Sequence, residues 1–187
     1  MKELKFYPTI WQTVPFSLDM MDQWDVDGKR IKDLILKNKY ASEKGVSQMN
    51  VNVIKFSAID KKGNEHIITD FSGNESMQLK GMHTGLFIKT KSVLKLDSGS
   101  YSTFRFYLSS KGNEFIYDDR SKEPLYRFDH LDFEIVNGLE LSGDESKQVL
   151  LRFDFEPFSL LSYLKPFQKF LQGIKFKKMK WASSYSH

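Results

Sequence analysis

The chain contains no cysteine, and this absence removes several kinds of chemistry at once. Without thiols the protein forms no disulfide, ligates no zinc through sulfur and has no thiol nucleophile. The absence does not fix a cellular compartment, because secreted proteins without cysteine also exist.

Long apolar runs are missing as well. No window of the sequence approaches the length of apolar chain that crosses a bilayer. The first residues, MKELKFYPTIWQ, lack the apolar stretch that follows the basic residues of a secretory signal peptide. We therefore expect either an intracellular protein or a mature chain given a start Met, and the sequence leaves both open.

Charge of one sign is not in large excess. Lys and Arg number 28 against 24 Asp and Glu, and the formal net charge of +4 is too small to predict nucleic-acid binding. A cluster of lysines near the C-terminus is the one basic candidate binding surface: Lys175, Lys177, Lys178 and Lys180. Such a cluster suits nucleic acid or an acidic lipid surface. A solvated final strand, whose lysines discourage edge pairing, is the favoured interpretation.

Aromatic residues are abundant, with 16 Phe, 8 Tyr and 3 Trp among 187 residues. Aromatic side chains bury large areas and are enriched in strands, so this composition favours a β protein. The length suits one well-buried domain. From residue 49 onward, short runs of alternating apolar and polar residues are separated by turns at sites such as Gly63-Asn64 and Gly112. This pattern predicts an antiparallel β-sandwich, such as the immunoglobulin type, or a barrel.

Two strands are predicted most clearly. In the stretch 96–110, a turn at Gly99 leads into a strand whose Phe104, Phe106 and Leu108 face the core while Arg105 faces the other way. In the stretch 147–158, one face of the predicted strand is apolar and consists of Val149, Leu151, Phe153 and Phe155. The opposite face carries Leu150, Arg152, Asp154 and Glu156.

The two ends of the chain depart from this pattern. Residues 1–45 read as an irregular N-terminal arm, in which the spacing around Leu34 and Ile35 fits either a short helix or a strand. Residues 46–187 are predicted to form the sandwich domain. Within it, the leucines and Gly173 of the stretch 157–173 predict a helical insert that Pro166 divides. A final strand is expected over 174–181.

One stretch has the spacing of a metal loop. Asp22, Asp25 and Asp27 precede Gly28 in DQWDVDG, as oxygen ligands precede a glycine in calcium loops. The later position that supplies a bidentate carboxylate in such loops is Leu34 here. We therefore predict no metal site and no cofactor.

Evidence for an enzyme is equally thin. His130 stands near Asp129, Asp132 and Glu134, a composition that suits general acid–base chemistry or simply a solvent-facing strand. No nucleophile elbow, phosphate loop or zinc-protease motif is present. Carboxylates on one strand, such as Asp154 and Glu156, do not define a glycosidase pair. We predict no catalytic residue, and the candidate surface aromatics are Tyr101, Tyr107, Tyr117 and Trp181.

Over about residues 49–156, the chain resembles the bacterial lipoprotein domain catalogued as domain of unknown function 4382. The order of MNVNVIKFSAIDKKGNEHIITD, ESMQLKGMHTG, LKLDSGSYSTFRFYLSS and LRFDFEPF carries the resemblance. The positions similar to the family's motifs are Leu79 with Gly85, then Leu96, Gly99, Tyr101 and Arg105, and finally Phe153, Asp154 and Phe155. The acylated Cys of the lipoprotein signal and the 157–173 insert are departures from it.

The resemblance implies a prealbumin-like β-sandwich in the cell envelope or outside the cell, with no catalytic residues to carry over. The leading hypothesis is a non-enzymatic envelope or extracellular module that binds a protein partner or self-assembles. It would touch a membrane only through a lipid anchor absent from this chain. The alternative is a structural subunit of a filament, sheath or phage tail, packed through its N-terminal arm. A hydrolase built on His130 is the third hypothesis.

Overall fold

Alternation of apolar and polar residues governs the fold of the described residues, of which 65% lie in strands and 7% in helices. The computed structural model describes residues 10–15, 28–90, 94–143 and 148–155. Their strands are β1 (Trp11–Pro15), β2 (Lys32–Lys37), β3 (Val46–Asp60), β4 (Glu65–Lys80), β5 (Leu86–Thr90), β6 (Gly99–Leu108), β7 (Glu114–Tyr117), β8 (Lys122–Pro124), β9 (His130–Leu141) and β10 (Val149–Phe153). Two short helices, α2 (Lys39–Lys44) and the 3₁₀ turn η1 (Met82–Thr84), complete these elements.

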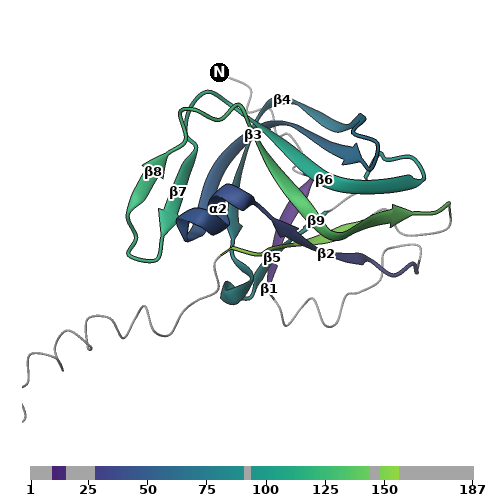
Figure 1. Cartoon of the computed structure of the whole chain (residues 1–187), viewed down its shortest axis with the longest axis horizontal. Coiled ribbons are helices and arrows are strands. Elements are labelled where there is room, and N and C mark those ends of the chain that lie inside the picture. The colour runs from purple at the N-terminus through teal and green to yellow at the C-terminus, as the bar shows by residue number, and fades with distance from the viewer. Residues whose placement is uncertain (1–9, 16–27, 91–93, 144–147, 156–187) are drawn as a thin grey trace, which may run out of the picture. The chain divides into compact units, whose positions relative to one another are not determined.

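The strands form one strongly curled sheet with the shape of a half-barrel (Figure 1). The order across it is β1-β5-β10-β2-β9-β6-β3-β7-β8, and β4 pairs with the other edge of β3. Strands β2 and β10 are parallel, whereas the other pairs among the described strands are antiparallel. The curl brings Gly81, just after β4, into a bridge with Phe153 of β10. The mainly β class is confirmed, and the two-layer sandwich stays a prediction.

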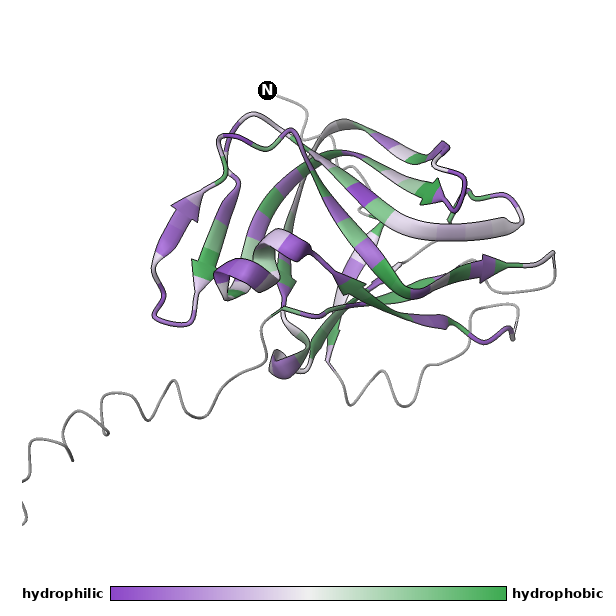
Figure 2. Ribbon diagram, viewed as in Figure 1, coloured by the Kyte–Doolittle hydropathy of each residue, from purple (hydrophilic) through white to green (hydrophobic). Residues whose placement is uncertain are grey.

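The concave side of the sheet holds the core. Phe104 and Phe106 of β6 are fully buried there, and Leu108 is nearly so, as the alternation predicted. The ring of Phe106 lies 4.7 Å from that of Phe56 and 5.4 Å from that of Phe133, between centroids. Each such buried side chain contributes roughly 1.5–3 kcal/mol relative to an exposed one. Figure 2 shows hydrophobic and hydrophilic residues alternating along these strands.

Strand β10 also confirms its predicted face. Val149, Leu151 and Phe153 are buried in the main core. On the opposite face, Leu150 belongs to a small second cluster with Ile31 and Phe87. The strand is therefore covered on both faces, which is typical of a strand that has a parallel neighbour.

The described part of the predicted N-terminal arm is regular. Residues 11–15 form β1, which pairs with β5, and residues 32–37 form β2, which pairs with β9 and β10. Of the two interpretations offered for the region around Leu34, the strand is correct. A helix forms only afterwards, where Asn38 accepts a hydrogen bond from the Ala41 N–H at 2.8 Å and caps α2. Both stretches are regular strands, because each pairs with strands that are far away in the sequence.

Three sequence predictions lie outside the described residues. They are the helical insert at 157–173, the final strand with its lysine cluster, and the acidic loop of Asp22, Asp25 and Asp27. Among the residues that the structure describes, no helix is long and apolar enough to span a membrane.

Candidate functional site

The strongest candidate site is a group of polar side chains on the convex side of the sheet. Because Phe104 and Phe106 point into the core, their neighbours Arg105 and Tyr107 must point outward. The strand register sets Arg105 opposite Asp132, and Tyr107 opposite His130 on β9 and Lys55 on β3. We call the following residues the outer-face cluster: Lys55 and Ser57 of β3, Glu65 of β4, Arg105 and Tyr107 of β6, and His130 and Asp132 of β9.

An ion pair of two-pronged geometry joins β6 to β9 in this cluster. The Arg105 guanidinium donates from Nε to Asp132 Oδ1 at 2.6 Å and from Nη2 to Oδ2 at 2.7 Å. The hydrogen bonds to Asp132 raise the pKa of Arg105 above its usual range. Bidentate pairing of this kind fixes the orientation of both side chains as well as their separation.

Glu65 links β4 to the adjacent strand β3 and to β6, which lies beyond β3. Its Oε1 accepts hydrogen bonds from the Ser57 hydroxyl at 2.5 Å and from the Tyr107 hydroxyl at 2.7 Å. The bond from Ser57, and to a lesser degree that from Tyr107, lowers the pKa of Glu65. The ammonium of Lys55 lies 3.7 Å from the centroid of the Tyr107 ring, in cation–π geometry. The Tyr107 side chain is therefore fixed by a hydrogen bond at its hydroxyl and by the Lys55 ammonium at the face of its ring.

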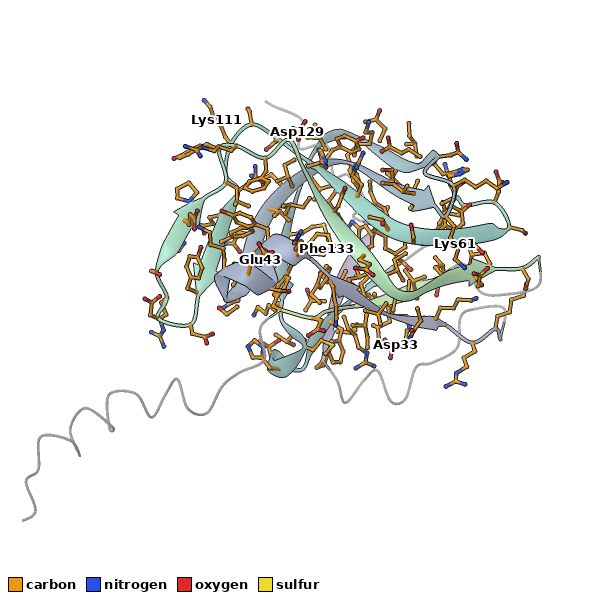
Figure 3. All side chains as sticks on the ribbon, in the orientation of Figure 1. Asp33, Glu43, Lys61, Lys111, Asp129 and Phe133 are labelled. Atoms are coloured by element: carbon orange, nitrogen blue, oxygen red, sulfur yellow. The ribbon has the colours of Figure 1, made fainter. Side chains whose placement is uncertain are left out.

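His130 lies at the start of β9, beside Asp129, which Figure 3 labels at the upper rim of the sheet. Its Nδ1 is 2.7 Å from Asp129 Oδ1, and its Nε2 is 4.0 Å from Asp132 Oδ2. Both ring nitrogens therefore face carboxylates. The contact with Asp129 orients the ring beside Tyr107, with 5.7 Å between ring centroids.

The predicted surface tyrosines differ in their surroundings. Tyr107 faces outward and belongs to the outer-face cluster. Tyr117 is half-buried and donates a hydrogen bond to Glu123, and burial together with that carboxylate raises the pKa of Tyr117 to about 12. Trp181 and the four C-terminal lysines lie outside the described residues.

The expectation that Tyr101 is exposed is wrong. Its side chain is 2% exposed, and its hydroxyl donates to the Asp97 carbonyl at 3.0 Å. The register between β6 and β9 shifts between Tyr101 and Thr103, so the strict alternation that runs through Phe104 is interrupted at Ser102. A one-residue irregularity moves a side chain to the other face of a sheet. Tyr101 therefore packs inward, where its ring lies 5.4 Å from that of His66.

Sequence reasoning missed most partners in the cluster. It placed Arg105 on the outer side and noted the acids near His130, but it paired neither with the other and did not single out Lys55 or Glu65. In the described part of the chain, no group of His, Asp and Glu side chains is arranged to hold a metal ion.

No protein-family model, no curated protein and no solved structure matches this chain. The resemblance to the lipoprotein domain of unknown function 4382 therefore stays a prediction that rests on the quoted residues.

Proposed function

We propose that the chain is a non-enzymatic binding module of the cell envelope or extracellular space, of lipoprotein type, with a prealbumin-like sandwich as its fold. It acts by contacting a protein partner through the outer-face cluster. The observation that carries this proposal is the mutual pairing of the cluster's functional groups. The guanidinium of Arg105 pairs with the carboxylate of Asp132, and the phenol of Tyr107 donates a hydrogen bond to the carboxylate of Glu65.

A set of mutually paired side chains on a convex surface is better suited to binding a protein partner than to catalysing a reaction. Arginine and tyrosine are the residue types that dominate binding energy at protein interfaces. Here both are held in place before a partner arrives, which reduces the entropy lost on binding. A hydrolase would need His130 directed at a nucleophile, whereas its two ring nitrogens face Asp129 and Asp132.

A site-specific cross-linker tests the role of the cluster. A photoreactive phenylalanine analogue replaces Tyr107 in one variant and Tyr126 in the other. Tyr126 is 82% exposed and lies between β8 and β9, outside the cluster, so it is a matched control. We expect one discrete cross-linked envelope or secreted protein from position 107 and none from position 126. Equal labelling at both positions, or none at either, contradicts the proposal.

The compartment has its own test. Fractionation of the source cells with an antibody to the chain is expected to recover it with the envelope or in the medium. An upstream reading frame with a lipidation-signal cysteine would agree with that result. Recovery in the cytosol contradicts the lipoprotein assignment and leaves the binding surface to be judged by cross-linking.

The alternative, a structural subunit packed through its N-terminal arm, is less well supported. Trp11 of β1 lies in the chain's own core, with its ring 4.9 Å from that of Phe56. Strand β1 pairs with β5 of the same chain. If residues 1–9 nonetheless join neighbouring subunits, then deleting them will dissolve a large assembly. The binding module predicts the same mass by light scattering with and without them.

A further inference from the structure

The first half of β4 lies at an edge of the sheet. Among the described strands, β4 pairs only with β3. At the turn between them, the Asp60 N–H donates to the Asn64 carbonyl at 2.9 Å. Hydrogen-bonded and non-bonded pairs alternate along an antiparallel ladder. Counting from that bond, the Ala58–His66 pair is bonded and the Ser57–Ile67 pair is not. The N–H and C=O of Ile67 therefore point away from β3.

This edge lacks two residue types that usually keep strand edges apart. Residues 66–69 read His-Ile-Ile-Thr, with no Lys and no Pro among them. Ile68 is buried in the core, but the side chain of Ile67 is 58% exposed. An exposed β-branched residue whose backbone groups also face outward is suited to pairing with another strand.

The outward-facing backbone groups of Ile67 favour one register for self-pairing. If two copies of the strand are antiparallel with a two-fold axis at Ile67, then Glu65 lies opposite Thr69 of the second copy, and His66 lies opposite Ile68. No like charges meet. An axis between Ile67 and Ile68 would set these two residues opposite one another, although Ile67 faces outward and Ile68 faces the core. Directly opposite residues of an antiparallel pair share one face of the sheet, so this second register is excluded.

We propose that two copies of this chain associate through antiparallel pairing of their β4 edges, with the two-fold axis at Ile67. The two isoleucine side chains then meet on the convex side, and each Ile67 N–H donates to the other copy's Ile67 carbonyl. The pairing is short, because the β3–β4 register shifts just beyond Ser57 and the resulting bulge at Ile68 ends the straight edge. The dimer should accordingly form reversibly as the concentration rises. This inference does not depend on the proposed binding function.

Single cysteines test the register, because the natural chain has none. In a bonded antiparallel pair the two Cα atoms are about 5.5 Å apart, a separation within the disulfide range of roughly 4.4–6.8 Å. We expect Ile67→Cys to form a disulfide-linked dimer under mild oxidation. Thr69→Cys is the matched control, because each Thr69 faces Glu65 and lies about 13 Å along the strand from its own counterpart. Equal cross-linking of the two variants, or none of Ile67→Cys, overturns the proposal.

Light scattering tests the association without a covalent link. The wild-type mass is expected to rise from 21.9 kDa toward twice that value with concentration, whereas Ile67→Lys stays at the monomer mass. Ile54→Lys is the control: Ile54 is 37% exposed but belongs to β3, so this variant should dimerise as the wild type does. A wild-type protein that stays monomeric at its highest soluble concentration overturns the proposal. So does an Ile67→Lys variant that still dimerises. Cross-linking from position 107 is unaffected by either outcome, so the two proposals fail separately.

Discussion

At the scale of single residues, the outer-face cluster is organised by pairs that cross from strand to strand. Arg105 and Asp132 are 27 positions apart in sequence and meet only because β6 and β9 are neighbours in a fixed register. Their side chains are 24% and 40% exposed, so water screens part of their attraction. The pair therefore orients the cluster more than it stabilises the fold.

A double-mutant cycle with Asp132→Asn and Arg105→Gln measures this contribution. We expect a coupling energy of about 0.5–1 kcal/mol from urea unfolding, near the upper end for exposed pairs because the geometry is bidentate. The coupling should fall as salt is added. The exposed pair Lys39–Glu43, at 3.9 Å, is the control and should show almost none. Equal coupling in the two pairs would show that the geometry adds nothing.

Asp60 makes the stability of the β3–β4 turn depend on pH. Its carboxylate accepts hydrogen bonds from the Asn64 side chain and from the Lys62 and Asn64 N–H groups. These bonds, that from the Asn64 side chain first, hold the pKa of Asp60 well below its usual range. Because the folded pKa is lowered, the stabilisation is present above the unfolded value of about 3.9 and is lost as the pH falls below it.

The urea midpoints of the wild type and Asp60→Asn, measured from pH 6 down to pH 2, test this dependence. At pH 6 the variant should unfold at a lower urea concentration than the wild type. The difference between the two midpoints should narrow below about pH 4. Asp119→Asn tests a second exposed turn, where the carboxylate accepts a hydrogen bond from the Ser121 N–H at 2.9 Å and bonds to Ser121 lower the pKa of Asp119. It should show a smaller effect, because that carboxylate accepts fewer hydrogen bonds. A gap for Asp60→Asn that does not change with pH would contradict the assignment.

At the scale of elements, β9 depends on a bulge between its two halves. Residues 130–134 pair with the far end of β6, and residues 139–141 pair with its start. Between them, Asn137 and Gly138 both have positive φ, at 66° and 71°. A Cβ on Gly138 would lie 3.2 Å from the Tyr101 carbonyl oxygen. Glycine is needed there for both reasons.

Gly138→Ala should therefore destabilise the protein by about 1–2 kcal/mol, the cost of left-handed backbone for a residue with a Cβ. Urea unfolding gives the value. Gly143→Ala is the matched control, because nothing lies within 4 Å of a Cβ built there and its φ is not in the left-handed region. If the two alanine variants unfold alike, the bulge does not constrain β9 in the way described.

The elements also differ in how well the sequence alone predicts them. The hairpin at Gly63, strands β6 and β10, and their inward faces were predictable, since each depends only on local alternation and turn residues. Strand β2 was ambiguous because the spacing of Ile31, Leu34 and Ile35 fits a helix equally well, and its parallel pairing with β10 is set by tertiary contacts. Tyr101 was assigned to the wrong face of β6, because the alternation of apolar and polar residues does not reveal where a bulge interrupts a strand. The outer-face cluster needed the β6–β9 register, which no local pattern contains.

At the scale of the whole molecule, the described part of the chain is one sheet. Its first strand, β1, contributes a side chain to the core that the curled sheet encloses. Trp11 lies against Phe56 and Phe106, with 4.9 Å and 6.1 Å between ring centroids. These two phenylalanines belong to the neighbouring strands β3 and β6, which lie far from β1 in the strand order. Losing contact with β1 would leave a large void beside them, so β1 should unfold together with β3 and β6.

Tryptophan fluorescence tests this cooperativity. Replacing Trp24 and Trp181 with Phe leaves Trp11 as the only tryptophan of the three in the sequence. We expect its red shift on urea unfolding to coincide with the loss of strand signal in far-ultraviolet circular dichroism, as two-state unfolding requires. A variant with Tyr126→Trp and Trp11→Phe in the same background is the control, and its exposed indole should change little. If the Trp11 transition came first, β1 would be a separately released strand, and the case against assembly through the N-terminal arm would lose its main support.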